Sequence, residues 1–85
     1  MVRLNEIKDS EECTVVSLFA KGIIRRRFQD IGIVEGTKIK RLHASPLGDP
    51  TAYLVRGAVI AIRSSDAYLI GVETNSWDSQ IPRSD

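Results

Sequence analysis

The stretch that decides the fold is Ile23-Ile-Arg-Arg-Arg-Phe-Gln-Asp-Ile-Gly-Ile-Val-Glu-Gly-Thr37. Within it, Ile24, Phe28 and Ile31 recur at the spacing of one helix face, and most of the polar side chains fall away from that face. Gly32 follows the last periodic residue, where a left-handed helix cap is expected. The stretch therefore predicts one short helix that stops at a glycine.

The rest of the chain has the pattern of short strands joined by tight turns. Gly36 supplies a positive φ for the turn that follows the helix, and Arg56-Gly57 is typical of a two-residue hairpin turn closed by Gly57. Alternation along 37–44 breaks at Arg41-Leu42, which indicates a bulge. The strands are predicted at 13–20, 37–44, 51–55, 58–63 and 68–73.

These elements predict a mainly β fold. Closure protects strand edges that a flat sheet would expose, so we expect a small, partly open SH3-like β-barrel of about five strands, with one short α-helix between the first two. The Pro- and Gly-rich loop at 45–50 and the tight hairpin favour an SH3-like barrel over an OB-fold. Residues 1–74 form the predicted domain. Residues 75–85 are expected to be a flexible tail unless Trp77 or Ile81 docks on the barrel.

Length and composition restrict the class of protein. A chain of 85 residues makes one domain with a small core. Its single cysteine, Cys13, forms no internal disulfide, which fits a reducing compartment. The N-terminus has no signal pattern, and the longest apolar run is far shorter than the ~20 residues of a membrane helix. We expect a cytoplasmic protein.

Charge is distributed unevenly along the chain. The net charge is only +1, which argues against a dedicated nucleic-acid binder. Between Lys21 and Arg63, however, nine basic residues face three acidic ones, so this span carries +6 and the two ends together carry −5. The middle of the chain is therefore expected to present a basic surface.

The chain resembles the FeoA family, ferrous iron transport protein A, over residues 2–73. The shared features are the end of the helix with its Gly-x-x-x-Gly-Thr turn, the Pro-x-Gly-Asp-Pro loop, the hairpin and an Ala-Ile-Arg run. The segments that carry them are Arg27-Phe28, Ile31–Thr37, Ala44–Pro50, Val55-Arg56-Gly57, Ala61-Ile62-Arg63 and Asp66-Ala67. The departures are Phe28 for the usual leucine, Glu35 where proline is common, and Ser45 inserted before Pro46.

This resemblance implies a small cytoplasmic SH3-like protein of bacterial ferrous iron uptake. The family partner is the membrane iron transporter FeoB, which carries a cytoplasmic G domain. A related SH3-like domain ends the iron-dependent repressors. The alternative function is therefore a regulatory or nucleic-acid-associated module of that kind, in which basic residues contact phosphates. A homo-oligomer that buries its strand edges is a third hypothesis.

No catalytic, cofactor or metal site is expected within one chain. Cys13 and His43 are the soft metal ligands, but there is no Cys-x-x-Cys, no paired histidine and no carboxylate cluster at ligand spacing. Transition metal binding between subunits stays open. No nucleophile–base pair can be recognised, so we predict that the chain is not an enzyme.

The arginine run is the most distinctive charged feature. Three consecutive helical residues span ~200–300° of the helix, so they cannot all face one partner. We predict that Arg25 and Arg26 face a partner, and that Arg27 is structural, with a pair to Asp30 as one option. The candidate partner-binding residues are Arg25, Arg26, Lys38, Lys40, Leu47 and Arg63; the structural motif is Ile24, Phe28, Ile31, Gly32, Gly36 and Gly57.

Overall fold

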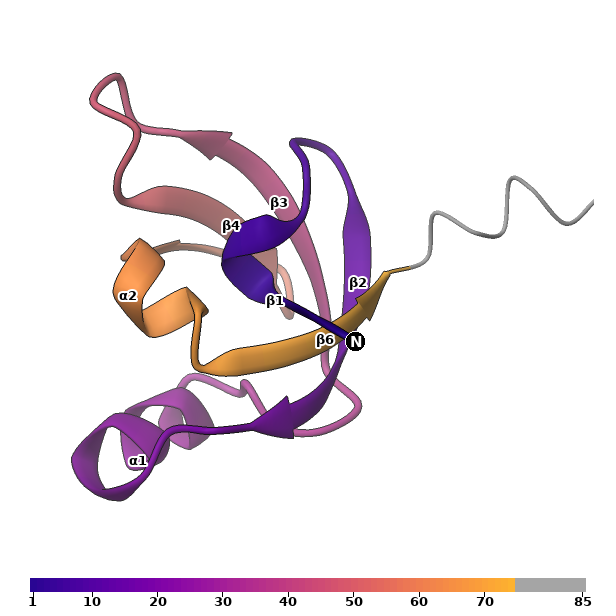
Figure 1. Cartoon of the computed structure of the whole chain (residues 1–85), viewed down its shortest axis with the longest axis vertical. Coiled ribbons are helices and arrows are strands. Elements are labelled where there is room, and N and C mark those ends of the chain that lie inside the picture. Colours follow the sequence, from indigo (N-terminus) through magenta and orange to yellow (C-terminus); the bar gives the residue numbers. More distant parts are fainter. Residues whose placement is uncertain (75–85) are drawn as a thin grey trace, which may run out of the picture.

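The computed structural model describes residues 1–74 and folds them into a curved sheet flanked by short helices (Figure 1). The elements are β1 (Val2–Arg3), η1 (Leu4–Glu6), β2 (Glu12–Leu18), α1 (Gly22–Asp30), β3 (Lys38–Ala44), β4 (Thr51–Val55), β5 (Ala58–Ile62), α2 (Ser64–Ala67) and β6 (Ile70–Thr74). The fold is mainly β, as predicted. Residues 75–85, with the tail prediction and with Trp77 and Ile81, lie outside the described residues.

All strand pairs are antiparallel, in the order β1-β6-β2-β3-β4-β5. The predicted count of five strands was wrong, because the two-residue strand β1 pairs with β6 through Val2 and Val72. The barrel is not closed: within residues 1–74, β1 and β5 form the two edges of one open sheet, where a partly open barrel was predicted. A two-residue strand leaves no periodicity in the sequence, so it escaped detection.

The core fills the concave side of this curved sheet. Alternate residues of the strands point inward because successive strand side chains face opposite sides. Leu4 and Ile7, in and just after η1, are both buried there. The fully buried side chains also include Cys13, Val15, Ile33, Ile39, Tyr53, Val55, Ile70 and Val72.

The helix α1 buries one face, but its stripe differs from the prediction. Phe28 is buried and Ile24 packs at the margin of the core, whereas Ile31 is 41% exposed. The helix ends at Asp30, so Ile31 is the cap residue and no longer lies on the helical stripe. Gly32, at φ +91°, reverses the chain and places Ile33 in the core. Ile33 therefore takes the role expected of Ile31.

Several local predictions are confirmed. The β3–β4 register shifts between Arg41 and His43, at the predicted bulge. Arg56 and Gly57 have φ of 52° and 84°, both positive as a two-residue hairpin of the most favoured type requires. Gly36 also has a positive φ. Within residues 1–74 no helix is long and apolar enough to cross a membrane.

Candidate partner-binding site

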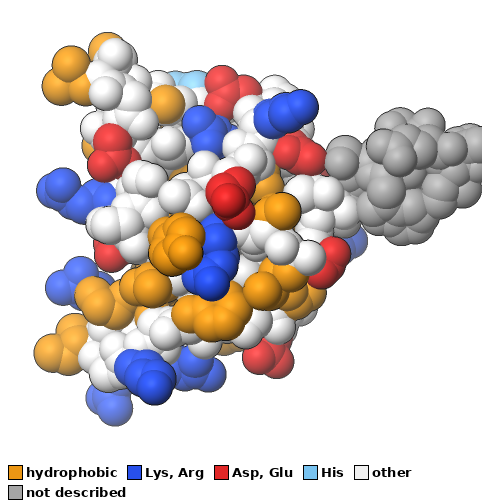
Figure 2. Space-filling view, in the orientation of Figure 1, with side chains coloured by type: hydrophobic (Ala, Val, Ile, Leu, Met, Phe, Trp, Pro, Cys, Tyr) orange, Lys and Arg blue, Asp and Glu red, His pale blue; other side chains and the backbone are white. Residues whose placement is uncertain are grey.

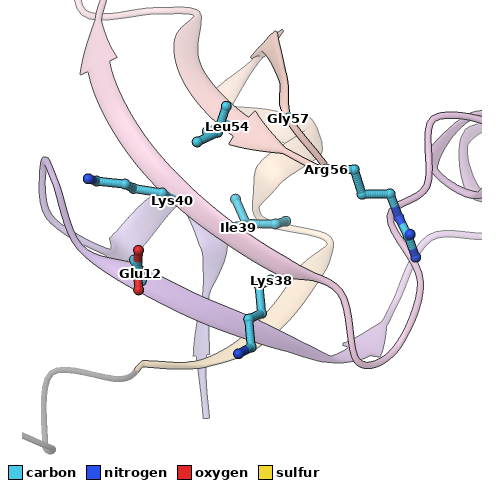
Figure 3. Close-up of a pocket in the computed structure, with 7 residues that line it drawn as sticks. All are labelled: Glu12, Lys38, Ile39, Lys40, Leu54, Arg56 and Gly57. Carbon is cyan, nitrogen blue, oxygen red and sulfur yellow. The ribbon is translucent and has the colours of Figure 1, made fainter.

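The clearest hollow beside predicted site residues lies on the convex face of the sheet, where β3 meets the β4–β5 hairpin. It is an open pocket of about 140 Å³, which we call the basic pocket (Figure 3). Its floor is apolar, and basic side chains stand around it. The lining residues are Glu12, Lys38, Ile39, Lys40, Leu54, Arg56 and Gly57.

Strand alternation positions the two lysines of this pocket. Ile39 is buried in the core, so Lys38 and Lys40 on either side of it point outward. The cross-strand register then aligns Glu12 with Lys40, and Lys40 with Leu54. One row of outward side chains thus changes from acidic to basic to apolar as it crosses three strands.

The third cation of the basic pocket, Arg56, is held by a hydrogen bond to a residue outside the pocket. Arg56 lies in the hairpin turn, and its Nε donates a hydrogen bond of 3.1 Å to the carbonyl oxygen of Gly32. Figure 3 shows Lys38, Lys40 and Arg56 pointing away from one another. Because the charges surround an apolar floor and do not converge, the pocket suits an extended acidic surface better than a single phosphate group.

The structure separates the other predicted partner-binding residues from this pocket. Arg25 is half-buried, and its Nη1 donates a hydrogen bond of 3.1 Å to the carbonyl oxygen of Leu18. Arg26 is exposed on the helix. Arg63 is exposed just after β5, and Leu47 is 94% exposed at the tip of the 45–50 loop.

The contacts within the arginine run differ in part from those expected. Arg25 ties α1 to the end of β2, whereas Arg27 is exposed and forms no ion pair with Asp30 among residues 1–74. Figure 2 shows Lys and Arg side chains gathered with hydrophobic ones at the end of the molecule that carries α1. In Figure 1 the 45–50 loop lies at the end of the molecule opposite α1.

Sequence reasoning missed Glu12, Leu54 and Arg56 as members of the basic pocket. The signal was present in part, since Leu54 is the outward residue between the buried Tyr53 and Val55. What was absent is the register of β4 against β3, which depends on the bulge between them.

The two soft ligands lie in different environments. Cys13 is fully buried, and its Sγ lies 3.5 Å from the carbonyl oxygen of Ile39. Burial, with the charges of Glu11 and Glu12, raises the pKa of the thiol from 9.0 to about 12. His43 is exposed on β3. Residues 1–74 hold no group of three or more His, Cys, Asp or Glu side chains arranged to bind a metal ion.

The chain is similar to iron transport proteins in sequence. It is 31% identical over 72 residues to a Porphyromonas gingivalis protein described as an Fe(2+) transport protein A/Fe(2+) transporter FeoB fusion protein. The match covers 85% of this chain and only 8% of that much longer protein.

Solved structures are similar over most of the chain. The FeoA-like protein of Clostridium acetobutylicum is 35% identical, with a TM-score of 0.81, over 87% of this chain and 86% of that one. A Stenotrophomonas maltophilia FeoA, described as complexed with zinc and as a prokaryotic SH3 domain protein, is 26% identical, with a TM-score of 0.76, over 86% and 91%. The fold is therefore SH3-like.

A manganese-dependent transcriptional repressor shares only the fold. It is 22% identical over 86% of this chain and 40% of its own, with a TM-score of 0.77. In contrast, the family model of the FeoA domain matches residues 2–74, which is nearly all of the 85 residues. The chain belongs to the FeoA family.

Proposed function

We propose that this protein is a cytoplasmic, non-enzymatic accessory of bacterial ferrous iron uptake. It binds the cytoplasmic G domain of a FeoB-like membrane transporter and modulates it. The observation that carries this proposal is the relative in which an Fe(2+) transport protein A segment and a FeoB transporter form one chain. Fusion keeps two domains at a high effective concentration relative to each other. Such a fusion is expected when the corresponding separate proteins bind each other.

The basic pocket supplies a surface of the right kind for that interaction. Lys38 and Lys40 are two of the residues predicted to bind the partner, and Leu54 adds an apolar contact between them and the edge strand. Complementary charge around an apolar centre raises the association rate and fixes orientation. The Cys13 thiol is fully buried against the carbonyl oxygen of Ile39, which makes it a poor candidate ligand for iron.

A binding measurement tests the proposal directly. The full chain is titrated with the purified cytoplasmic domain of the FeoB-like transporter from the same organism, without nucleotide, with GDP and with a GTP analogue. We expect binding in at least one state, and we expect Lys38→Glu/Lys40→Glu to weaken it at least tenfold, mostly through a slower association rate.

The matched control reverses two exposed lysines outside the pocket, Lys8→Glu/Lys21→Glu. This control changes the net charge by the same amount as Lys38→Glu/Lys40→Glu. We expect it to bind the transporter domain much more tightly than that pocket variant does. The proposal fails if the wild-type chain binds in no nucleotide state. The assignment of the surface fails if the two double variants bind equally well.

The alternative, a nucleic-acid-associated regulatory module, is supported by the fold that the repressor shares. At 22% identity this likeness concerns architecture alone. A gel shift at low salt separates the two functions, because binding to a nucleic acid weakens steeply as salt rises. Retardation of DNA at low salt, together with no binding to the transporter domain, would favour the alternative.

A further inference from the structure

The edge strand β5 has no strand partner on its outer side within residues 1–74. It forms the end of the sheet opposite β1 and pairs only with β4, from Ala58 opposite Val55 to Ile62 opposite Thr51. A row of unpaired backbone N–H and C=O groups at a sheet edge is a template for pairing with another strand.

The hairpin geometry identifies which backbone groups are unpaired. A two-residue turn with both φ positive closes on a hydrogen-bonded pair, here Val55 and Ala58. Hydrogen-bonded pairs alternate along an antiparallel ladder, so Ile60 and Ile62 also bond to β4. The backbone groups of Val59 and Ala61 therefore point away from the sheet.

This edge lacks the devices that usually block pairing. The strand Ala58–Ile62 contains no charged residue and no proline, and its register with β4 has no bulge. Val59 is 66% exposed. The opposite edge is different, since β1 has only two residues. An apolar, regular and unprotected edge of five residues is unusual in a protein that stays monomeric.

A second hollow lies directly beside this edge, between β5 and α1, with a volume of about 230 Å³. Ile60 and Ile62 line it from β5, and Phe28 of α1 and the cap residue Ile31 line it from the other side. The charged residues Arg27, Asp30 and Asp66 also line it. We call it the edge pocket. A strand added to β5 would point every second side chain to the same side of the sheet as Ile60. One apolar side chain of that strand would then enter the edge pocket.

The charges at the two ends of β5 distinguish between possible occupants. The segment 56–63 has no acidic residue, and it begins with Arg56 and ends with Arg63. If two copies of β5 paired antiparallel about Ile60, Arg63 of each copy would lie near Arg56 of the other, and like charges repel. A strand with carboxylates at both ends would instead be attracted to Arg56 and Arg63, which together with Arg27 outnumber the two carboxylates, Asp30 and Asp66, that line the edge pocket.

We propose that β5 binds an extended segment of a partner protein, an apolar strand with acidic residues at both ends. The segment adds to the sheet through the backbone of Val59 and Ala61, and one of its apolar side chains fills the edge pocket. This mode of recognition takes its affinity from main-chain hydrogen bonds and its specificity from alternate side chains. The inference goes beyond the proposed function and does not depend on it.

A synthetic peptide tests the interaction with the full chain. The probe is acetyl-Glu-Glu-Val-Thr-Val-Thr-Val-Glu-Glu-amide, titrated into isotope-labelled protein and followed by the amide signals in NMR spectra. We expect the largest shifts at Val59 and Ala61, and slower hydrogen exchange at both. The same peptide with alternate amides N-methylated cannot form the ladder, and it should bind at least tenfold more weakly.

The contribution of charge is tested with a second peptide, in which lysines replace the four glutamates. That peptide should bind several-fold more weakly at low salt, and the difference should shrink as salt rises. Equal binding of the two peptides at low salt would contradict the role of Arg56 and Arg63. If the acidic peptide fails to shift Val59 and Ala61 at millimolar concentration, the proposal is wrong.

A matched pair of variants tests the edge itself. Val59→Pro removes an outward N–H that β4 does not use, and a proline at such a position is tolerated on an edge strand. Val59→Thr keeps both the N–H and the β-branched shape. We expect Val59→Thr to bind the peptide like the wild type and Val59→Pro to lose at least tenfold in affinity.

Two outcomes would overturn the proposal. One is equal binding of the peptide by both variants. The other is self-association of the wild-type chain that Val59→Pro abolishes, with no binding of the peptide, since the occupant of the edge would then be a second copy. If Val59→Pro does not fold, the N-methylated peptide on the wild-type chain decides the question.

Discussion

Arg56 lies over Gly32, and its Nε donates a hydrogen bond of 3.1 Å to the Gly32 carbonyl oxygen. This contact joins the β4–β5 hairpin to the turn after α1, 24 residues earlier. A Cβ on Gly32 would lie 2.6 Å from the Cδ of Arg56, and the backbone there has φ +91°. Glycine at position 32 thus suits the positive φ, and a Cβ there would displace the Arg56 side chain from its hydrogen bond.

Gly32→Ala is expected to destabilise the fold more than Gly36→Ala. Both glycines have positive φ, which costs an alanine about 1–2 kcal/mol. A Cβ on Gly36 meets nothing within 4 Å, so Gly36→Ala should lose only that amount. Urea unfolding gives both free energies. In the Gly32→Ala background, Arg56→Ala should cost less than in the wild type, because it relieves the clash. Equal losses for the two glycine variants would contradict this account.

Ile33→Ala should lower the free energy of unfolding by about 2–5 kcal/mol, as expected for a fully buried aliphatic side chain. Ile31→Ala is the matched control, two residues earlier on the other side of Gly32. It should cost less than about 1 kcal/mol, because Ile31 is partly exposed. Chemical denaturation measures both. A larger loss for Ile31→Ala would mean that the helical stripe continues into the core as the sequence pattern predicts.

The stability of the fold should fall as pH rises above about 9. The pKa of Cys13 is about 12 in the folded chain and 9.0 ordinarily, so between these values the unfolded chain releases the proton and the folded chain keeps it. Unfolding is then favoured by up to about 1.4 kcal/mol per pH unit. Below pH 9 this contribution is fully present and independent of pH.

Urea unfolding between pH 8 and pH 10.5 measures this slope, and Cys13→Ala should reduce it. Burial also raises the pKa of Tyr53, so part of the slope should survive in that variant. Thiol-specific reagents should label the native wild-type chain only at the rate of unfolding. Fast labelling of the native chain at pH 8 would show that the thiol is accessible.

Arg25→Ala should destabilise the fold, whereas Arg26→Ala should not. Arg25 donates a charge-assisted hydrogen bond to the carbonyl oxygen of Leu18, a type of bond worth about 1.5–3 kcal/mol. Arg26 is exposed, and its removal should change stability by less than about 0.5 kcal/mol. Thermal unfolding compares the stability of the two variants, each of which loses one positive charge. Equal stability would show that the Arg25 contact contributes nothing in solution.

Local patterns predicted a large part of this fold because they depend on nearby residues. The helix stop at Gly32, the positive φ of Gly36 and the hairpin at Arg56-Gly57 follow from backbone sterics alone. The strand Thr51–Val55 was predicted with its observed bounds. The outward direction of Lys38 and Lys40 follows from strand alternation around the buried Ile39.

Features that join distant segments could not be predicted in this way. The pairing of β1 with β6 brings residue 2 beside residue 72, and nothing in either segment specifies that neighbour. The hydrogen bond that ties Arg25 to β2 depends on how α1 packs, which helix geometry alone does not give.

The sequence by itself determined the class of fold, the places where the chain turns, and membership of the FeoA family, because these depend on local sterics and on an ordered set of motifs. Only the tertiary structure decided that the sheet formed by residues 1–74 stays open, with β5 at one edge. It alone also decided that Lys40, Leu54 and Arg56 share one pocket. The physical reason is register: alternation gives the side of the sheet on which a side chain lies, but only the pairing of strands gives its neighbours.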